Sequence, residues 1–193
     1  MGQMQNQLTR FGVELRTEIR RGNILGGHAS VFNQVADLGS HLEEIDTRAF
    51  KRTLDDPETD VRALFNHNPD YLLGRQSSGT LKLGTDSEGL EFEVELPDTE
   101  WGRSVKILAD RRDLNGASFG FIPDEAEWGE VRGRRLMRHT SVGRLIDVSP
   151  VTFPAYGGAA VAMRSKQFIT PTSEAALLRS QLIRLRHNAR YGR

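Results

Sequence analysis

The stretch Asn115-Gly116-Ala117-Ser118-Phe119-Gly120-Phe121 guides the interpretation of the whole chain, because it places one hydroxyl among small and aromatic residues. Its two phenylalanines alternate with smaller residues, as in a half-buried strand, and glycines flank Ser118 on both sides. The glycine spacing matches a strand-to-helix nucleophile elbow, but Pro123 follows where that elbow needs a helix. The sequence therefore predicts a strand serine, which either bonds to a neighbour or acts as a nucleophile.

Composition limits the chemistry that the chain can carry. The 193 residues include 26 Lys and Arg against 26 Asp and Glu, so no net charge draws the protein to nucleic acid or to a membrane surface. The chain has no cysteine, which removes disulfides, thiol nucleophiles and cysteine-containing zinc sites. No apolar run approaches the ~20 residues that span a bilayer, and no signal-peptide core is present. We therefore expect a soluble intracellular protein whose nucleophile is a serine, a threonine or a carboxylate.

Hydrophobic periodicity predicts one domain that is mainly β. The 19 glycines favour a turn-rich sheet over a helical bundle. Alternation and apolar runs predict strands at 13–20, 24–32, 61–65, 80–83, 90–96, 134–139 and 142–148.

Other segments lack strand periodicity. A short helix is predicted within 43–54, and a second one after Asp98 or Thr99. Between Pro123 and Gly133 the pattern predicts a polar excursion, and Pro150 and Pro154 predict that the segment after the last strand lies at a sheet edge or in an extended loop. Residues 1–10 have no period and predict a loose arm, whereas 165–172 resembles a linker. Residues 173–193 carry a leucine stripe surrounded by arginines, which predicts a basic amphipathic helix.

A nucleophilic serine needs a base, and histidine is the usual one near neutral pH. Of the five histidines, His67 is the best placed, since turn-forming asparagines flank it at the end of a predicted strand. His139 is its rival, because it lies on a strand after Ser118. The sequence also allows a structural role for each of these side chains.

Asp147 is the most informative acid, because it interrupts an apolar run. An unpaired buried carboxylate costs several kcal/mol, so this side chain must either face solvent or be paired. In a hydrolase it could hold the base in the correct tautomer and stabilise its charged form.

Several motifs taken together resemble the tailed-phage prohead protease family, the capsid maturation serine proteases related to herpesvirus assemblin. The resemblance covers roughly 11–164. It is carried by the serine stretch and by Gly27-His28-Ala29-Ser30-Val31-Phe32-Asn33, Glu44-Ile45 before Arg48-Ala49-Phe50, Asn66-His67-Asn68, Leu73-Gly74-Arg75, Gly89-Leu90, and Leu145-Ile146-Asp147-Val148-Ser149-Pro150-Val151-Thr152-Phe153-Pro154-Ala155-Tyr156.

The resemblance implies an α+β, mainly β fold, with a closed or nearly closed barrel and a few surrounding helices. It implies an arm at 1–10, a protease domain at 11–164 and a linker with a basic tail at 165–193. The family's histidine falls on His67 and its serine on Ser118. Phage members commonly carry an acid at the position of Asp147, whereas assemblin-like relatives use a second histidine, which would be His139.

The implied activity is that of a serine endopeptidase without cofactor or metal. Its expected substrates are a scaffold protein, or the scaffolding segment of the major capsid protein, and the protease itself, with self-cleavage in the tails. The expected location is the immature capsid in the host cytoplasm. Self-association is possible, and neither a membrane nor a specific nucleic acid is expected as a partner. A non-catalytic barrel that serves as scaffold or capsid-binding module is the alternative, and a metal hydrolase is a more distant one.

Overall fold

The computed structural model describes residues 9–13 and 18–153, with side chains from residue 22 onward. All of these belong to the first of the two units into which the chain divides, Met1–Ala162. The linker expected at 165–172 and the basic helix expected at 173–193 lie outside the described residues.

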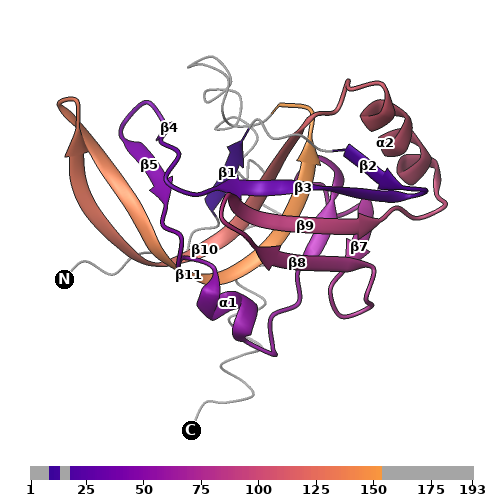
Figure 1. Cartoon of the computed structure of the whole chain (residues 1–193), viewed down its shortest axis with the longest axis horizontal. Helices are drawn as coiled ribbons and strands as arrows, with labels where there is room; N and C mark the ends of the chain where they lie inside the picture. The colour runs from indigo at the N-terminus through magenta and orange to yellow at the C-terminus, as the bar shows by residue number, and fades with distance from the viewer. Residues whose placement is uncertain (1–8, 14–17, 154–193) are drawn as a thin grey trace, which may run out of the picture. The chain divides into compact units, whose positions relative to one another are not determined.

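A seven-stranded sheet carries the residues that the sequence singles out. Its main path runs in the order β1 (Thr9–Val13), β10 (Gly116–Val131), β11 (Arg134–Val151), β5 (Leu42–Ile45) and β4 (Ala36–Asp37), while β6 (Arg62–Leu64) pairs with β11, and β7 (Leu72–Arg75) pairs with β6. The long strand β11 is the centre of this sheet (Figure 1). It pairs antiparallel with β10 along one side, and parallel with β5 and then β6 on the other.

A four-stranded antiparallel sheet supplies the second layer of the core. Its order is β2 (Glu18–Arg21), β3 (Ile24–Val31), β9 (Gly89–Glu95) and β8 (Leu81–Thr85). The hairpin predicted from the alternation around 80–96 is confirmed as β8 and β9. Of the strand predicted over 13–20, residue 13 ends β1 and 18–20 lie in β2, which belongs to the other sheet, while 14–17 lie outside the described residues.

Phenylalanine rings from distant segments meet in the core. Phe119 stacks on Phe121 with ring centroids 5.1 Å apart, and Phe50 meets Phe119 edge-on at 5.3 Å. Phe92 of β9 is buried in the same cluster. Because neighbouring strand residues point to opposite faces, burial of Phe119 turns Ser118 to the other face of β10.

The helices are few and short. The helix predicted after residue 99 is confirmed as α2 (Glu100–Asp110), which Thr99 caps by accepting a hydrogen bond from Gly102 N at 3.2 Å. The helix expected within 43–54 is largely wrong. Only α1 (Lys51–Asp55) is helical, 46–50 lead into it through turns, and 43–45 belong to β5, whose four side chains are all buried. Parallel pairing with β11 outweighs the local helical preference there.

The polar excursion expected at 123–133 is also wrong. Strand β10 continues through register shifts around Pro123 to Val131, and Arg132 and Gly133 turn the chain with φ of 52° and 74°. The two strands expected at 134–139 and 142–148 are one strand, β11. Pairing between β10 and β11 satisfies the backbone hydrogen-bonding groups of this polar segment without burying apolar side chains (Figure 1). Hydrophobic periodicity therefore does not detect the strand.

The mainly β class with few helices is confirmed, but the barrel, expected to be closed or nearly closed, is not closed. In the part of the chain that the structure describes, the strands form two separate sheets, and neither closes on itself. Periodicity identifies strands, whereas closure depends on which edges meet, and that information is not local. The same described residues contain no helix long and apolar enough to cross a membrane.

The close approach of β9 to β3 gives a test of this packing. A Cβ added at Gly89 would lie 1.8 Å from the carbonyl oxygen of Ser30, whereas one added at Gly84 of β8 would meet no atom within 4 Å. Gly89→Ala is expected to lower the free energy of unfolding by about 3 kcal/mol, because backbone must move. Gly84→Ala serves as the control, with a much smaller effect. Equal denaturation midpoints for the two variants would contradict the pairing of β3 with β9.

Candidate active site

His67 lies at the tip of the β6–β7 hairpin, in the short 3₁₀ turn η1 (Phe65–His67). Asn66 and His67 both have a left-handed backbone, with φ of 55° and 56°. Asparagine and histidine adopt this region more readily than most residues, but each such residue still costs about 1–3 kcal/mol. Tertiary contacts must therefore hold the tip in this conformation.

One of those contacts joins His67 to Asp147 of β11. The distance between His67 Nδ1 and Asp147 Oδ1 is 2.5 Å, and the two side chains are 13% and 3% exposed. A carboxylate accepts only from a protonated ring nitrogen, so Nδ1 carries the proton in this pair. The neutral ring is then left with Nε2 as its proton acceptor.

Asp147 is buried and paired, which decides between the two possibilities that the sequence leaves open. Its Oδ1 also accepts a hydrogen bond from Ser149 Oγ at 2.6 Å. Two donors on one oxygen offset the cost of removing this carboxylate from water and fix its orientation.

Ser118 occupies the same face of the sheet as Asp147. In the β10–β11 pairing, Ser118 stands opposite Ser149, and Gly120 stands opposite Asp147. Side chains of directly paired residues share a face, so Ser118 and Asp147 are diagonal neighbours with Cα atoms ~7–8 Å apart. Ser118 is 5% exposed, and it lies on the strand that the sequence predicts, not at a strand-to-helix elbow.

Glycines leave room beside Ser118. Gly12 of β1 pairs directly with Ser118, and Gly120 follows two residues later on the same face. A residue without Cβ lets another backbone approach closely. Neither Gly12 nor Gly120 therefore adds a side chain beside Ser118.

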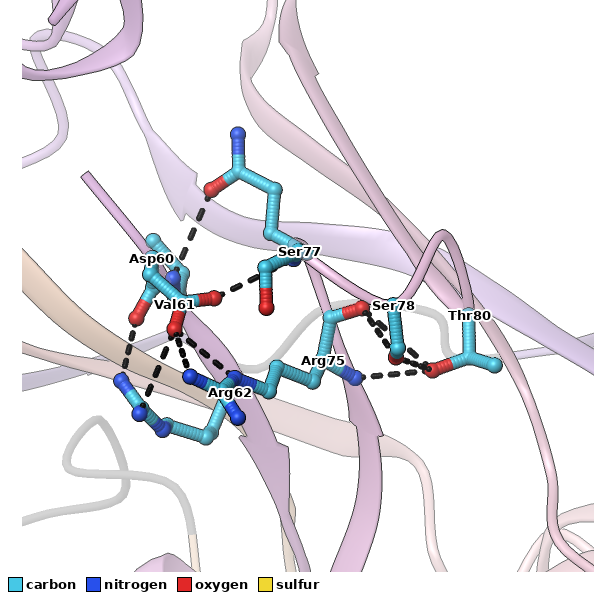
Figure 2. A network of polar contacts seen from close by, with 8 residues as sticks. Asp60, Val61, Arg62, Arg75, Ser77, Ser78 and Thr80 are labelled. Carbon is cyan, nitrogen blue, oxygen red and sulfur yellow. Dashed lines mark hydrogen bonds and ion pairs between the residues drawn. The ribbon is translucent and has the colours of Figure 1, made fainter. Parts of the chain in front are cut away.

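A polar network fixes the other end of the hairpin that carries His67 (Figure 2). Asp60 Oδ2 accepts from Arg75 Nε at 2.7 Å and Nη2 at 2.5 Å, and Asp60 Oδ1 accepts from Ser77 N at 3.1 Å. Arg62 lies 3.3 Å from the same carboxylate and is the parallel-strand partner of Asp147. The hydrogen bond from Arg75 holds the pKa of Asp60 far below its ordinary value of 3.8. The base of the β6–β7 hairpin is thus tied together beside β11.

His139, the alternative third member, lies in a different environment. Its side chain is 2% exposed, and the ring meets Phe121 edge-on with centroids 5.2 Å apart and has Nε2 at 3.5 Å from Glu43 Oε2. Phe121 belongs to the core side of β10, whereas Ser118 points to the opposite side. This geometry favours Asp147 over His139 as the partner of His67.

Glu43 lies buried between two histidines. His41 Nε2 contacts Glu43 Oε1 at 2.7 Å, and His139 contacts the other carboxyl oxygen. Burial works to raise the pKa of Glu43, but the contacts with His139 and His41 outweigh it and hold the pKa below the ordinary value of 4.5. This cluster links β5 to β11 within the sheet.

Of the remaining histidines, His28 lies apart from this arrangement. His28 Nε2 contacts Asp86 Oδ2 at 2.8 Å, and His187 lies outside the described residues. Arg144 is exposed and stands opposite Ile122 in the β10–β11 pairing. Within residues 9–13 and 18–153, no group of three or more His, Cys, Asp or Glu side chains is arranged to hold a metal ion.

Two residues of this region were not predicted as part of the site. Ser149 follows Asp147 by two positions, which places both on one face of a strand, and that period could have identified it. Asn66 bonds to Thr152 through both its amide atoms. The one sequence signal for Asn66 is that asparagine adopts a left-handed backbone conformation readily and here stands beside a candidate histidine.

The chain was compared with protein families, curated proteins and solved structures. The family model described as "Caudovirus prohead serine protease" matches residues 12–173. Among solved structures, that of the bacteriophage T4 capsid assembly protease gp21 matches with 11% sequence identity and a TM-score of 0.44, over 75% of this chain and 97% of that one. No curated protein is a significant match to this chain.

The lowered pKa of Glu43 predicts how stability depends on pH. A carboxyl whose pKa is lower in the folded than in the unfolded protein stabilises the fold at pH values above its unfolded pKa. This contribution is lost as the pH falls below about 4.5 and through the folded pKa. Glu43→Gln is therefore expected to lower the free energy of unfolding by about 1–3 kcal/mol at pH 7 and by less at pH 3. Denaturation at both pH values measures the difference, and an equal loss at the two would contradict a stabilising charged Glu43.

Proposed function

The chain belongs to the caudovirus prohead serine protease family, and on that premise we propose that Ser118, His67 and Asp147 are the catalytic triad of this protease. The observation that carries the proposal is the 2.5 Å contact between His67 Nδ1 and Asp147 Oδ1, on the sheet face that also holds Ser118. Family membership supplies the reaction, the hydrolysis of a peptide bond by a serine. The pairing of β10, β11 and β6 supplies a reason for these three residues to act together.

In the proposed mechanism, Ser118 Oγ attacks the carbonyl carbon of the peptide while its proton passes to His67 Nε2. Asp147 stabilises the imidazolium through Nδ1 and keeps the ring from turning. His67 then gives its proton to the leaving amine. In the second half of the reaction, water attacks the acyl group on Ser118 while His67 accepts its proton, and His67 then returns a proton to Ser118 Oγ as the acid product leaves. Ser149 keeps the carboxylate of Asp147 oriented through the 2.6 Å hydrogen bond.

The tetrahedral intermediate needs hydrogen-bond donors about 2.7–3.1 Å from its oxyanion. We propose backbone amides near Ser118 or the guanidinium of Arg144 for this role. The exposure of Arg144 on β11, three residues before Asp147, supports its inclusion.

The proposed substrates are a scaffold protein or the scaffolding segment of the major capsid protein, cleaved inside the immature capsid in the host cytoplasm. The protease itself is a further proposed substrate. In this proposal 11–164 is the protease domain, related in fold to assemblin, and self-cleavage occurs in 165–193 and within 1–10 before Thr9, because Thr9 and Arg10 already pair with β10. The family name supports the prohead as the place of action.

Co-expression with the cognate major capsid protein tests the substrate, with intact-mass analysis of both chains. Wild-type protein is expected to yield discrete terminal fragments that are missing with Ser118→Ala. Uncut capsid protein in assembled proheads that contain the wild-type chain would contradict the proposed substrate.

Substitution within the triad tests the assignment of roles. Ser118→Ala and His67→Ala are each expected to lower kcat/KM by ~10⁴-fold or more, and the double variant to lose no more than either one, because the residues act as a unit. Asp147→Asn is expected to cost less than either, but far more than His139→Gln. Substantial activity in either single alanine variant would refute its assignment, and a larger loss in His139→Gln than in Asp147→Asn would make His139 the third member.

A further inference from the structure

We propose that Asn66 and Thr152 form a positioning pair that fixes the His67 loop onto the end of β11. The inference rests on the proposed function, since it assigns a role within the same site. It adds two residues that touch neither the nucleophile nor the reacting bond in this proposal, and that act through His67.

The side-chain amide of Asn66 bonds to Thr152 in both directions. Asn66 Nδ2 donates to Thr152 Oγ1 at 3.1 Å, and Thr152 N donates to Asn66 Oδ1 at 2.8 Å. The two residues are 86 positions apart in the sequence. Two bonds to one planar amide define both a distance and an orientation, which a single bond cannot do.

The pair gives the loop a second attachment to the strand that holds Asp147. His67 contacts β11 at Asp147, and Asn66 contacts Thr152, the residue directly after the strand ends. These anchor points are five residues apart, which corresponds to ~16 Å of extended chain. Adjacent side chains of the loop therefore reach separate points, and together they resist a rotation of the loop about either contact.

The loop needs such support because of its backbone. Two local backbone bonds close successive turns of the loop, from Asn68 N to Phe65 O at 3.1 Å and from Tyr71 N to Asn68 O at 3.0 Å. The left-handed conformation occurs at Asn66 and His67, within the turn that the first of these bonds closes. The contact with Thr152 restrains Asn66 at the point where the chain turns toward the imidazole.

Exposure indicates that the pair serves orientation more than folding. Asn66 and Thr152 are both exposed, so water competes for the same hydrogen-bonding groups, and the net gain in stability from the bonds is small. The reaction rate depends far more strongly on the position of a catalytic group, because a displacement of ~1 Å lowers the rate by about 10²-fold.

The experiment measures how fast a fluorophosphonate probe labels Ser118 in the full chain, followed by intact mass. Asn66→Gly removes both bonds while glycine retains access to positive φ. Asn33→Gly is the matched control, since Asn33 is also exposed and also has φ of 55° but lies outside the site. Thr152→Val removes only the hydroxyl, and Thr152→Ser restores it.

Asn66→Gly is expected to label ~10–100-fold more slowly than Asn33→Gly at a similar thermal midpoint. Thr152→Val is expected to slow labelling less, with recovery in Thr152→Ser. The Asn66→Gly/Thr152→Val double variant is expected to be no slower than Asn66→Gly, because the two side chains share their bonds. The proton NMR signal of His67 Nδ1–H is expected to shift or broaden in Asn66→Gly, a change that a purely structural role would not produce.

The outcomes separate the inference from the proposed function. Equal labelling rates in Asn66→Gly and Asn33→Gly, with Ser118→Ala unlabelled, would overturn the positioning role alone. The positioning role would also be overturned if Thr152→Val were labelled as fast as wild type, or if the NMR signal of His67 Nδ1–H were unchanged in Asn66→Gly. Labelling of Ser118→Ala at the wild-type rate, or no labelling of wild type, would instead overturn the proposed function and the inference with it.

Discussion

The hydrogen bond between His67 Nδ1 and Asp147 Oδ1 is the constraint on which the proposed site depends. It joins a hairpin tip to the interior of a sheet, and it holds a carboxylate that is almost wholly removed from water. Without a partner, such a carboxylate would be costly, and without the carboxylate the imidazole would be free to turn. The same contact therefore stabilises the buried carboxylate of Asp147 and sets the His67 tautomer that a general base requires.

The rest of the described fold serves to bring these two groups together. Strand β11 lies between β10, which carries Ser118, and β6, which leads to His67. The register places Ser118 and Asp147 on one face, and the burial of Phe119 on the other face prevents a slip by one residue. Asp60 ties the base of the β6–β7 hairpin, while Asn66 contacts Thr152 at its tip. The positions of Ser118 and Asp147 follow from sheet register, and the position of His67 follows from the two anchors of the hairpin that carries it.

Sequence predicted the elements of this site better than their assembly. Strand alternation identified β8 and β9, a short apolar run identified β6, and capping chemistry identified α2, because these signals are local. The β5 strand and the long polar hairpin were missed, since their stability comes from pairing with β11 at positions remote in sequence. The pairing of Asp147 with His67 could be inferred only from a resemblance, because 80 residues separate them. The contacts of Ser149 and Asn66 depend on register and backbone conformation, which composition does not reveal.

The most direct test of the account is to map the residue modified by a fluorophosphonate in the wild-type chain, by peptide mass spectrometry at neutral pH. The account predicts a single adduct on Ser118, whose formation is lost when His67 is replaced by alanine. An adduct on another serine, or one on Ser118 that forms equally well without His67, would contradict the central claim that this pair acts with Asp147 as one catalytic unit.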